Sequence, residues 1–261
     1  MYPYLFENSI GETMLVPTYG LLLAMAFTVS YIDALRRAIA KKQDPKHTEK
    51  LFLLLVVGAL GGARLFHVLI EGFSYYRKNP ERIMAIWEGG FTFYGGLLAS
   101  LALVYGYARW QKLSFSATLD GLAPSTILGL AIGRVGCFAA GCCWGTSTKV
   151  PWAVTYTHKH TLSQMRHVPV HPVQLYESLG ALVLFLYLNH IAKKNSPAGT
   201  VALHGLAGYA VLRFIVEYFR GDEYRGFVLG GWLSVSQALS IALLAACTTW
   251  SLKNRPTFAP T

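Results

Sequence analysis

The sequence predicts an all-α polytopic membrane protein with seven transmembrane helices. The chain has 261 residues, of which 53% are hydrophobic and only 14% are charged, whereas a soluble domain carries about 25% charged residues. Apolar runs of about 20 residues, the length that crosses a hydrocarbon layer about 30 Å thick, recur along the chain. Internal repeats and low-complexity segments are not evident. We therefore expect a single integral-membrane domain over residues 1–261.

Seven segments have the length and composition of membrane-spanning helices. They are residues 14–32, 51–70, 91–110, 119–140, 173–191, 200–218 and 233–252. The first segment lacks the basic start and the small-residue cleavage site of a signal peptide, so we expect it to be a helix of the mature protein. It places Tyr19 beside a glycine, in VPTYGLL.

The second and third segments combine polar side chains with paired glycines. In GGARLFHVLIEG, within the second segment, Arg64, His67 and Glu71 fall on one helix face, because residues three or four apart are neighbours on a helix. Tyr94 stands directly before two glycines at the start of the third segment. A tyrosine in that place is typical of an anchor at the membrane interface.

Polar features also mark the fourth and fifth segments. The fourth ends in GRVGCFAAGCCWG, residues 133–145, which joins Arg134 to three cysteines and four glycines. Since glycine lets other groups approach the backbone, we expect a tight turn there that can face a ligand. At the start of the fifth segment, in VPVHPVQLYES, Gln174 and Glu177 face one way. In an apolar bundle this pair favours a polar cavity over bulk lipid.

The sixth segment carries its charges on one face. In GYAVLRFIVEYFR, Tyr209, Arg213 and Glu217 follow one another at intervals of four residues, and Arg220 comes three residues later. Because side chains four apart on a helix are neighbours, we expect Arg213 and Glu217 to neutralise each other.

The basic residues set the predicted orientation. A net charge of +10 would indicate a nucleic-acid partner in a soluble protein, but here the charges follow the membrane, so we expect no nucleic acid. The side that holds DALRRAIAKKQDPKHTEK carries twelve Lys and Arg residues, and the other side carries eight in nearly twice the loop length. The positive-inside rule then places the N-terminus outside and the C-terminus in the cytoplasm.

Three of the 23 Lys and Arg residues remain inside predicted helices: Arg64, Arg134 and Arg213. Each costs about 2.5–3.5 kcal/mol at a helix centre, so each needs a partner or must snorkel to the interface. The clear intramembrane acids are Glu177 and Glu217, with Asp120 and Glu71 at helix ends, so Arg134 has no acid near it on its own helix. A guanidinium beside glycine-rich backbone suits a bidentate oxyanion, such as the phosphate of a lipid head group.

The cysteines admit three interpretations. Cys137, Cys142 and Cys143 have the spacing C-x4-C-C, which lacks the C-x2-C hairpin of thiolate metal sites, and no second Cys or His cluster completes a tetrad. A redox pair would favour C-x-x-C or paired loop cysteines. The simplest interpretation is that small apolar residues let helices pack closely. We therefore expect no metal and no cofactor.

The intramembrane arginines and acids thus predict a polar cavity within seven helices that can bind a phosphate group. Such a cavity would serve an enzyme or a transporter. The motifs add a resemblance. GRVGCFAAGCCWG, HPVQLYES, RFIVEYFRGD and GGWLSVSQALSI, preceded by PTYG, GGARL and GGFTFYGGLL, resemble the bacterial prolipoprotein diacylglyceryl transferases in order and spacing over almost the whole chain. The resemblance implies seven transmembrane helices with an outer N-terminus, in the bacterial plasma (inner) membrane.

The resemblance also implies an activity. Members of the family transfer diacylglycerol from phosphatidylglycerol to the thiol of the lipobox cysteine in a preprolipoprotein and release glycerol phosphate. The implied partners are phosphatidylglycerol, the lipobox segment and the bilayer. The catalytic candidates are Arg134, Arg213 and Tyr94. Together with the residue analysis, the resemblance gives these substrate-binding candidates: Tyr19, Arg64, Gly145, Gln174, Glu177, Tyr209, Glu217 and Arg220.

This chain departs from the family pattern at three positions. Tyr94 stands where the family usually has a histidine, the proposed base for the incoming thiol, and Cys137 and Cys142 stand in place of an asparagine and an acid. If Tyr94 orients the head group, His67, Glu217 or the field of the arginines is left to handle the proton. A phospholipid-binding or transport paralogue and a membrane thiol oxidoreductase remain alternative functions.

Overall fold

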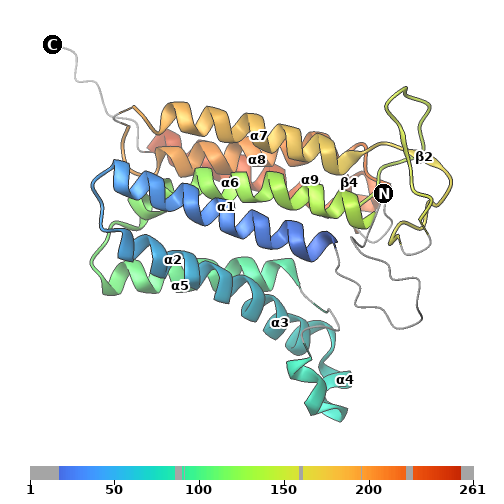
Figure 1. Cartoon of the computed structure of the whole chain (residues 1–261), viewed down its shortest axis with the longest axis horizontal. Coiled ribbons are helices and arrows are strands. Elements are labelled where there is room, and N and C mark those ends of the chain that lie inside the picture. Colours follow the sequence, from blue (N-terminus) through green and yellow to red (C-terminus); the bar gives the residue numbers. More distant parts are fainter. Residues whose placement is uncertain are drawn as a thin grey trace. The chain divides into compact units, whose positions relative to one another are not determined.

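The computed structural model describes residues 18–85, 90, 92–158, 161–194, 196–221 and 226–253. Each of the seven predicted segments contains a helix (Figure 1). The helices are α1 (Thr18–Ala40), α2 (Pro45–Val57), α3 (Ala63–Phe66), α4 (Phe73–Lys78), α5 (Phe93–Trp110), α6 (Phe115–Ala140), α7 (Val173–Ile191), α8 (Thr200–Glu217) and α9 (Val235–Lys253). The predicted segments therefore identify the right elements, with shifts at their ends.

Two of these shifts have clear causes. Helix α1 continues beyond residue 32, and its extra turns are held by the ion pair of Arg37 with Asp33, whose Nε and Oδ2 are 2.6 Å apart at i and i+4. The second segment starts earlier than predicted, because Asp44 caps the first turn of α2 by accepting from the backbone N–H of Lys46 at 2.9 Å. It then runs on through the π-helical turns η1 (Gly58–Gly62) and η2 (His67–Glu71), on either side of α3.

Four helices in the described part of the chain are long and apolar enough to cross a membrane. They are Thr18–Ala40, Pro45–Ile70, Phe115–Ala140 and Thr200–Glu217. Their lengths match the hydrocarbon thickness of a bilayer. The chain is thus an all-α protein with the helices of a membrane protein.

The chain folds into two compact units, which we describe separately. Unit 1 comprises Met1–Ser30 and Leu122–Thr261, and unit 2 comprises Tyr31–Gly121. In unit 1, α8 packs against both α7 and α9 (Figure 1). Its apolar core includes Ala131 of α6, Leu188 of α7 and Val201 of α8. This packing fixes the inner faces of three helices that each carry a charged residue.

Unit 2 is built on close contact between α5 and the helix formed by α2, η1 and α3. A Cβ atom on Gly62 would lie 2.7 Å from the carbonyl oxygen of Gly95, and one on Gly96 would lie 2.6 Å from that of Ala59. Small residues therefore let the two backbones touch, as in many membrane helix pairs. Ser100 adds a hydrogen bond across the contact, donated to the carbonyl of Leu55 at 3.0 Å.

Two pairs of short strands lie in the connections that precede α7 and α9. In unit 1, β1 (Val154–Thr155) pairs with β2 (Pro169–Val170) between α6 and α7, and β3 (Phe227–Val228) pairs with β4 (Leu233–Ser234) before α9. Trp144, Tyr156 and Val170 form a small buried cluster under the first pair. That cluster fixes the chain that leaves the end of α6.

Candidate active site

The carboxylate of Glu177 is the central acceptor of a buried polar cluster in unit 1. Glu177 lies in the second turn of α7 and is only 2% exposed. Its Oε1 lies 2.9 Å from Nη2 of Arg134 on α6, and its Oε2 lies 3.5 Å from Nη1 of Arg213 on α8. Tyr209 donates a further hydrogen bond to Oε1 at 3.1 Å. One acid thus pairs with two arginines from different helices, including Arg134, whose own helix has an acid only at its far end, Asp120.

Arg213 is held from a second side as well. Its Nη2 lies 2.8 Å from Oε2 of Glu217, as the spacing of four residues predicts, and donates to the hydroxyl of Ser236 on α9 at 3.1 Å. Nε of Arg220 lies 4.0 Å from the same Glu217 oxygen. We call the set Arg134, Glu177, Tyr209, Arg213, Glu217 and Arg220 the arginine cluster.

The arginine cluster combines three guanidinium groups with two carboxylates. Nε of Arg134 is buried and has no hydrogen-bond partner among the described residues. A buried donor without an acceptor costs about 1–3 kcal/mol, so such groups are usually satisfied. This unpartnered guanidinium nitrogen suits a ligand with oxygen acceptors.

The three cysteines beside Arg134 are brought together by the way in which α6 ends. Gly141 adopts the left-handed conformation, with φ of 78°, which is the typical C-terminal cap of a helix. Its N–H bonds to the carbonyl of Phe138 at 3.2 Å, and the N–H of Cys142 bonds to that of Cys137 at 3.2 Å. This is the bond pattern of a Schellman motif, in which the residues at its two ends contact each other through their side chains. In this protein those residues are Cys137 and Cys142.

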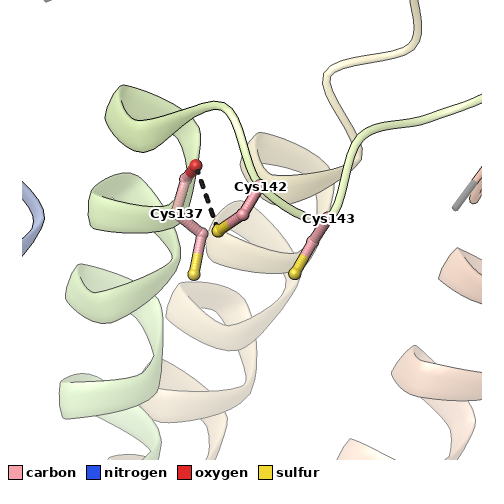
Figure 2. Close-up of side chains that lie close together, drawn as sticks. All are labelled: Cys137, Cys142 and Cys143. Carbon is pink, nitrogen blue, oxygen red and sulfur yellow. Dashed lines mark hydrogen bonds between the residues drawn. The ribbon is translucent and has the colours of Figure 1, made fainter. Parts of the chain in front are cut away.

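Figure 2 shows the result, with the three side chains gathered at the end of α6. The Sγ atoms of Cys137, Cys142 and Cys143 all lie within 4.8 Å of one another. Nη1 of Arg134 lies 4.0 Å from the Sγ atoms of both Cys137 and Cys143. We call residues 137–143 the thiol turn. The C-x4-C-C spacing therefore does not keep the three thiols apart, because the helix cap brings Cys142 and Cys143 next to Cys137.

The same motif corrects the expected extent of the turn. The sequence predicts a tight turn throughout GCFAAGCCWG, but residues 133–140 are helical and the turn begins only at Gly141. Helical backbone is internally hydrogen-bonded, so this stretch does not offer the exposed backbone that its glycines suggest. The chemistry of the segment therefore lies in its side chains.

Gln174 fixes the thiol turn from α7. Its Nε2 donates to the carbonyl of Cys142 at 2.5 Å and to the hydroxyl of Tyr156 at 3.0 Å. Burial raises the pKa of Tyr156 to about 12, so its hydroxyl stays neutral at physiological pH and can accept this bond. No sequence pattern singles out Tyr156, since the connection in which it lies is long and polar. Only the β1–β2 pairing brings it inward.

Gly145 ties the chain after the thiol turn to the end of α8. It forms an isolated antiparallel bridge with Arg220, and the N–H of Gly221 bonds to the carbonyl of Trp144 at 3.0 Å. A Cβ on Gly145 would collide with the carbonyl oxygen of His171. Glycine is therefore required at this position for a packing reason, and its presence sets the place of Arg220.

The remaining predicted residues lie outside the arginine cluster. Tyr19, 40% exposed, begins α1 and packs near α6, where a Cβ on Gly136 would lie 3.3 Å from its ring. Arg64 belongs to unit 2, where its guanidinium donates to backbone carbonyls, among them those of Arg82 at 2.6 Å and Ile83 at 3.1 Å. Tyr94 is the second residue of α5, and its side chain lies outside the described part of the structure.

These features define a class: a helical protein of membrane type with buried arginines held by glutamates beside a cluster of thiols. The family model described as prolipoprotein diacylglyceryl transferase matches residues 7–252. Proteins named phosphatidylglycerol–prolipoprotein diacylglyceryl transferase are similar over nearly their whole length. That of Methylococcus capsulatus is 35% identical over 232 residues, covering 87% of this chain and 86% of its own.

Other relatives agree. The protein of the same name from Geobacter sulfurreducens is 36% identical over 230 residues, which cover 86% of this chain and 85% of that protein. The one from Vibrio cholerae is 35% identical over 258 residues, which cover 96% and 92%. This chain belongs to the prolipoprotein diacylglyceryl transferase family.

Proposed function

We propose that this protein transfers the diacylglyceryl group of phosphatidylglycerol to the thiol of the lipobox cysteine of preprolipoproteins. Glycerol phosphate is the second product. Family membership over residues 7–252 and the names of relatives at about 35% identity support this activity. The structural observation that carries it is the arginine cluster, in which Glu177 brings the guanidinium groups of Arg134 and Arg213 together and Nε of Arg134 has no hydrogen-bond partner among the described residues.

The reaction replaces a carbon–oxygen bond with a carbon–sulfur bond. The acceptor thiol loses its proton, and a lone pair of its sulfur attacks the glyceryl carbon that bears the phosphate. The bond from that carbon to oxygen breaks, and its electron pair leaves with the phosphate oxygen. Negative charge therefore grows on the leaving group, which is where fixed cations lower the barrier most.

Arg134 and Arg213 hold the phosphate in this proposal and stabilise the leaving oxygen. Glu177 keeps the two guanidinium groups together when no lipid is bound, and Tyr209 fixes Glu177. Glu217 and Arg220 place Arg213 by the contacts described above. In water these cations would be screened, but inside a bundle the low dielectric strengthens their effect.

The other predicted residues take supporting roles in the proposal. Tyr19 lies at the end of α1 nearest Gly136, where it contacts substrate. Gly145 and Gln174 hold the chain around the thiol turn. Arg64 and Tyr94 belong to unit 2, and for them we propose the substrate-binding and head-group roles that the sequence analysis predicts.

We further propose the membrane arrangement that the sequence predicts. All seven segments cross the bacterial plasma membrane within a single domain, with the N-terminus outside and the C-terminus in the cytoplasm. The helices found in each segment support the count, and the distribution of Lys and Arg supports the orientation.

The test is transfer by the purified full-length protein. A lipobox peptide incubated with it and phosphatidylglycerol should gain the mass of one diacylglyceryl group. Arg134→Ala and Arg213→Ala should abolish the gain, whereas Arg109→Ala, at the exposed end of α5, should leave it unchanged. If the wild-type protein binds phosphatidylglycerol but modifies no peptide, it is a lipid-binding paralogue and the proposal fails.

A further inference from the structure

The thiol turn has the chemistry of a metal site. Thiolate ligands select soft or borderline ions, and zinc is usually bound by four ligands when its role is structural but by three when it is catalytic. With a Zn–S distance of about 2.3 Å, two sulfurs on one tetrahedral ion lie about 3.8 Å apart. The Sγ atoms of Cys137, Cys142 and Cys143 lie within 4.8 Å of one another, so small side-chain rotations would bring all three onto one ion.

We propose that Cys137, Cys142 and Cys143 bind a zinc ion whose fourth position is open to the acceptor thiol. The three cysteines are half-buried, which leaves one side of the cluster accessible. Among the described residues, no other group of three His, Cys, Asp or Glu side chains is placed to bind a metal ion. The proposal rests on the proposed function for the identity of the acceptor.

The surroundings of the thiols support an ion. Three thiolates on Zn²⁺ carry one negative charge, and Nη1 of Arg134 lies 4.0 Å from two of the sulfurs, where it offsets that charge. Gln174 holds the backbone of Cys142 through a hydrogen bond to its carbonyl. Such contacts outside the ligands fix their orientation and raise metal affinity.

The position of the ion explains why it would serve this reaction. Arg134 faces the thiols with Nη1 and the arginine cluster with Nη2, so one guanidinium joins the proposed phosphate site to the proposed metal site. A thiol that coordinates zinc is deprotonated. The acceptor thiol therefore releases its proton to solvent on binding and is already a thiolate when it attacks the glyceryl carbon. The thioether product is neutral and a weaker ligand, which favours its release.

The same step removes the need for a strong side-chain base. A tyrosine has an ordinary pKa near 10 and is a poor base at neutral pH, so Tyr94 would be an unsuitable proton acceptor. Binding to zinc instead lowers the pKa of the substrate thiol itself. Arg134 and Arg213 then need not activate the acceptor thiol and can stabilise the leaving phosphate.

Metal content is the first measurement. The full-length protein, purified from cells grown with zinc, should carry about one zinc ion per chain. Cys137→Ser, Cys142→Ser and Cys143→Ser should each reduce the zinc content to background. Cys247→Ser is the matched control, because Cys247 is the one cysteine outside the thiol turn, and it should keep the ion. Equal zinc in all variants, or copper or iron in place of zinc, would overturn the inference.

Cobalt substitution tests the open position. Protein loaded with Co²⁺ alone should show the absorption of thiolate-bound tetrahedral cobalt. Adding a lipobox peptide should shift this spectrum, and the same peptide with serine in place of its cysteine should not. An unchanged spectrum with the cysteine peptide would mean that the acceptor does not reach the ion, and the catalytic role fails.

Transfer assays separate this inference from the proposed function. Removing the ion with a chelator should lower the rate of transfer by about tenfold or more, and added Zn²⁺ should restore it while phosphatidylglycerol binding stays constant. If the metal-free protein transfers at the rate of the zinc-loaded protein, the zinc inference is refuted and the proposed function stands. No transfer by zinc-loaded protein with bound lipid would instead refute the proposed function.

Discussion

Glu177 shows how one residue sets the electrostatics of the site. In the sequence, Arg134 has no acid near it on its own helix, where Asp120 lies fourteen residues away, and Glu177 is an acid on another helix. The structure pairs them at 2.9 Å and adds Arg213 on the other oxygen. Because each charge would be costly alone in an apolar bundle, the three side chains stabilise one another.

Replacing Glu177 by glutamine keeps its size and removes its charge. Arg134 and Arg213 would then lose the carboxylate that they share, although Arg213 would keep its contact with Glu217. We expect the free energy of unfolding to fall by about 3 kcal/mol. Thermal unfolding in detergent, followed by tryptophan fluorescence, measures the loss. Asp33→Asn is the control, because this acid forms a more exposed pair with Arg37 and should cost about 0.5 kcal/mol or less. Similar losses in both variants would contradict a central role for Glu177.

Arg213→Lys tests geometry at constant charge. The guanidinium of Arg213 reaches Glu177, Glu217 and the hydroxyl of Ser236 at once, and a lysine ammonium cannot reproduce this planar arrangement. We expect kcat for transfer to fall about a hundredfold, the loss typical of a misplaced transition-state donor, with a smaller change in KM. Arg109→Lys should have no effect. A wild-type kcat in Arg213→Lys would mean that charge alone suffices.

At the scale of the element, the end of α6 decides what the cysteines are. Their spacing does not match a known metal motif, yet Gly141 reverses the chain and sets Cys142 against Cys137. The signal was present in the sequence as a glycine four residues after a cysteine and just before another. This spacing predicts a contact between Cys137 and Cys142 only once the helix is known to end at Ala140.

Gly141→Ala should disturb this cap. Alanine is strained at a φ of 78°, and its Cβ would collide with the hydroxyl of Thr161, so we expect a loss of about 1–2 kcal/mol in stability. The zinc content should fall with it, since Cys142 and Cys143 follow the cap. Gly121→Ala is the control in the same helix, because a Cβ there meets nothing within 4 Å, and it should be neutral or slightly stabilising. Unaltered stability and zinc content in Gly141→Ala would contradict the role of the cap.

At the scale of the whole molecule, the helices that carry the polar site are also predicted to cross the membrane. Helix α7 carries Gln174 and Glu177, and it is not among the four helices of membrane-spanning composition in the described part. Both polar side chains are buried, so they face protein rather than lipid. Helices α6 and α8, which also build the site, are among the four, so composition identifies some helices of the site as spans and misses another.

The proposed orientation gives a test on the intact cell membrane. A cysteine introduced at Ser9 should react with a membrane-impermeant maleimide from outside, and one introduced at Ser114, between α5 and α6, should react only after permeabilisation. The excess of Lys and Arg on the predicted cytoplasmic side is the reason. The wild-type protein, with its four native cysteines, gives the background. The reverse pattern of labelling would invert the topology.

The sequence by itself determined the helices, the candidate arginines and the pairing of Arg213 with Glu217, because hydrophobic length and helical spacing are local properties. Only the tertiary structure decided which acid holds Arg134, and that Tyr156 and Ser236 belong to the site. It also decided that three cysteines form one cluster beside Arg134. These contacts join residues distant in the chain, and they depend on how α6 ends and on which helix faces pack together, which no local pattern specifies.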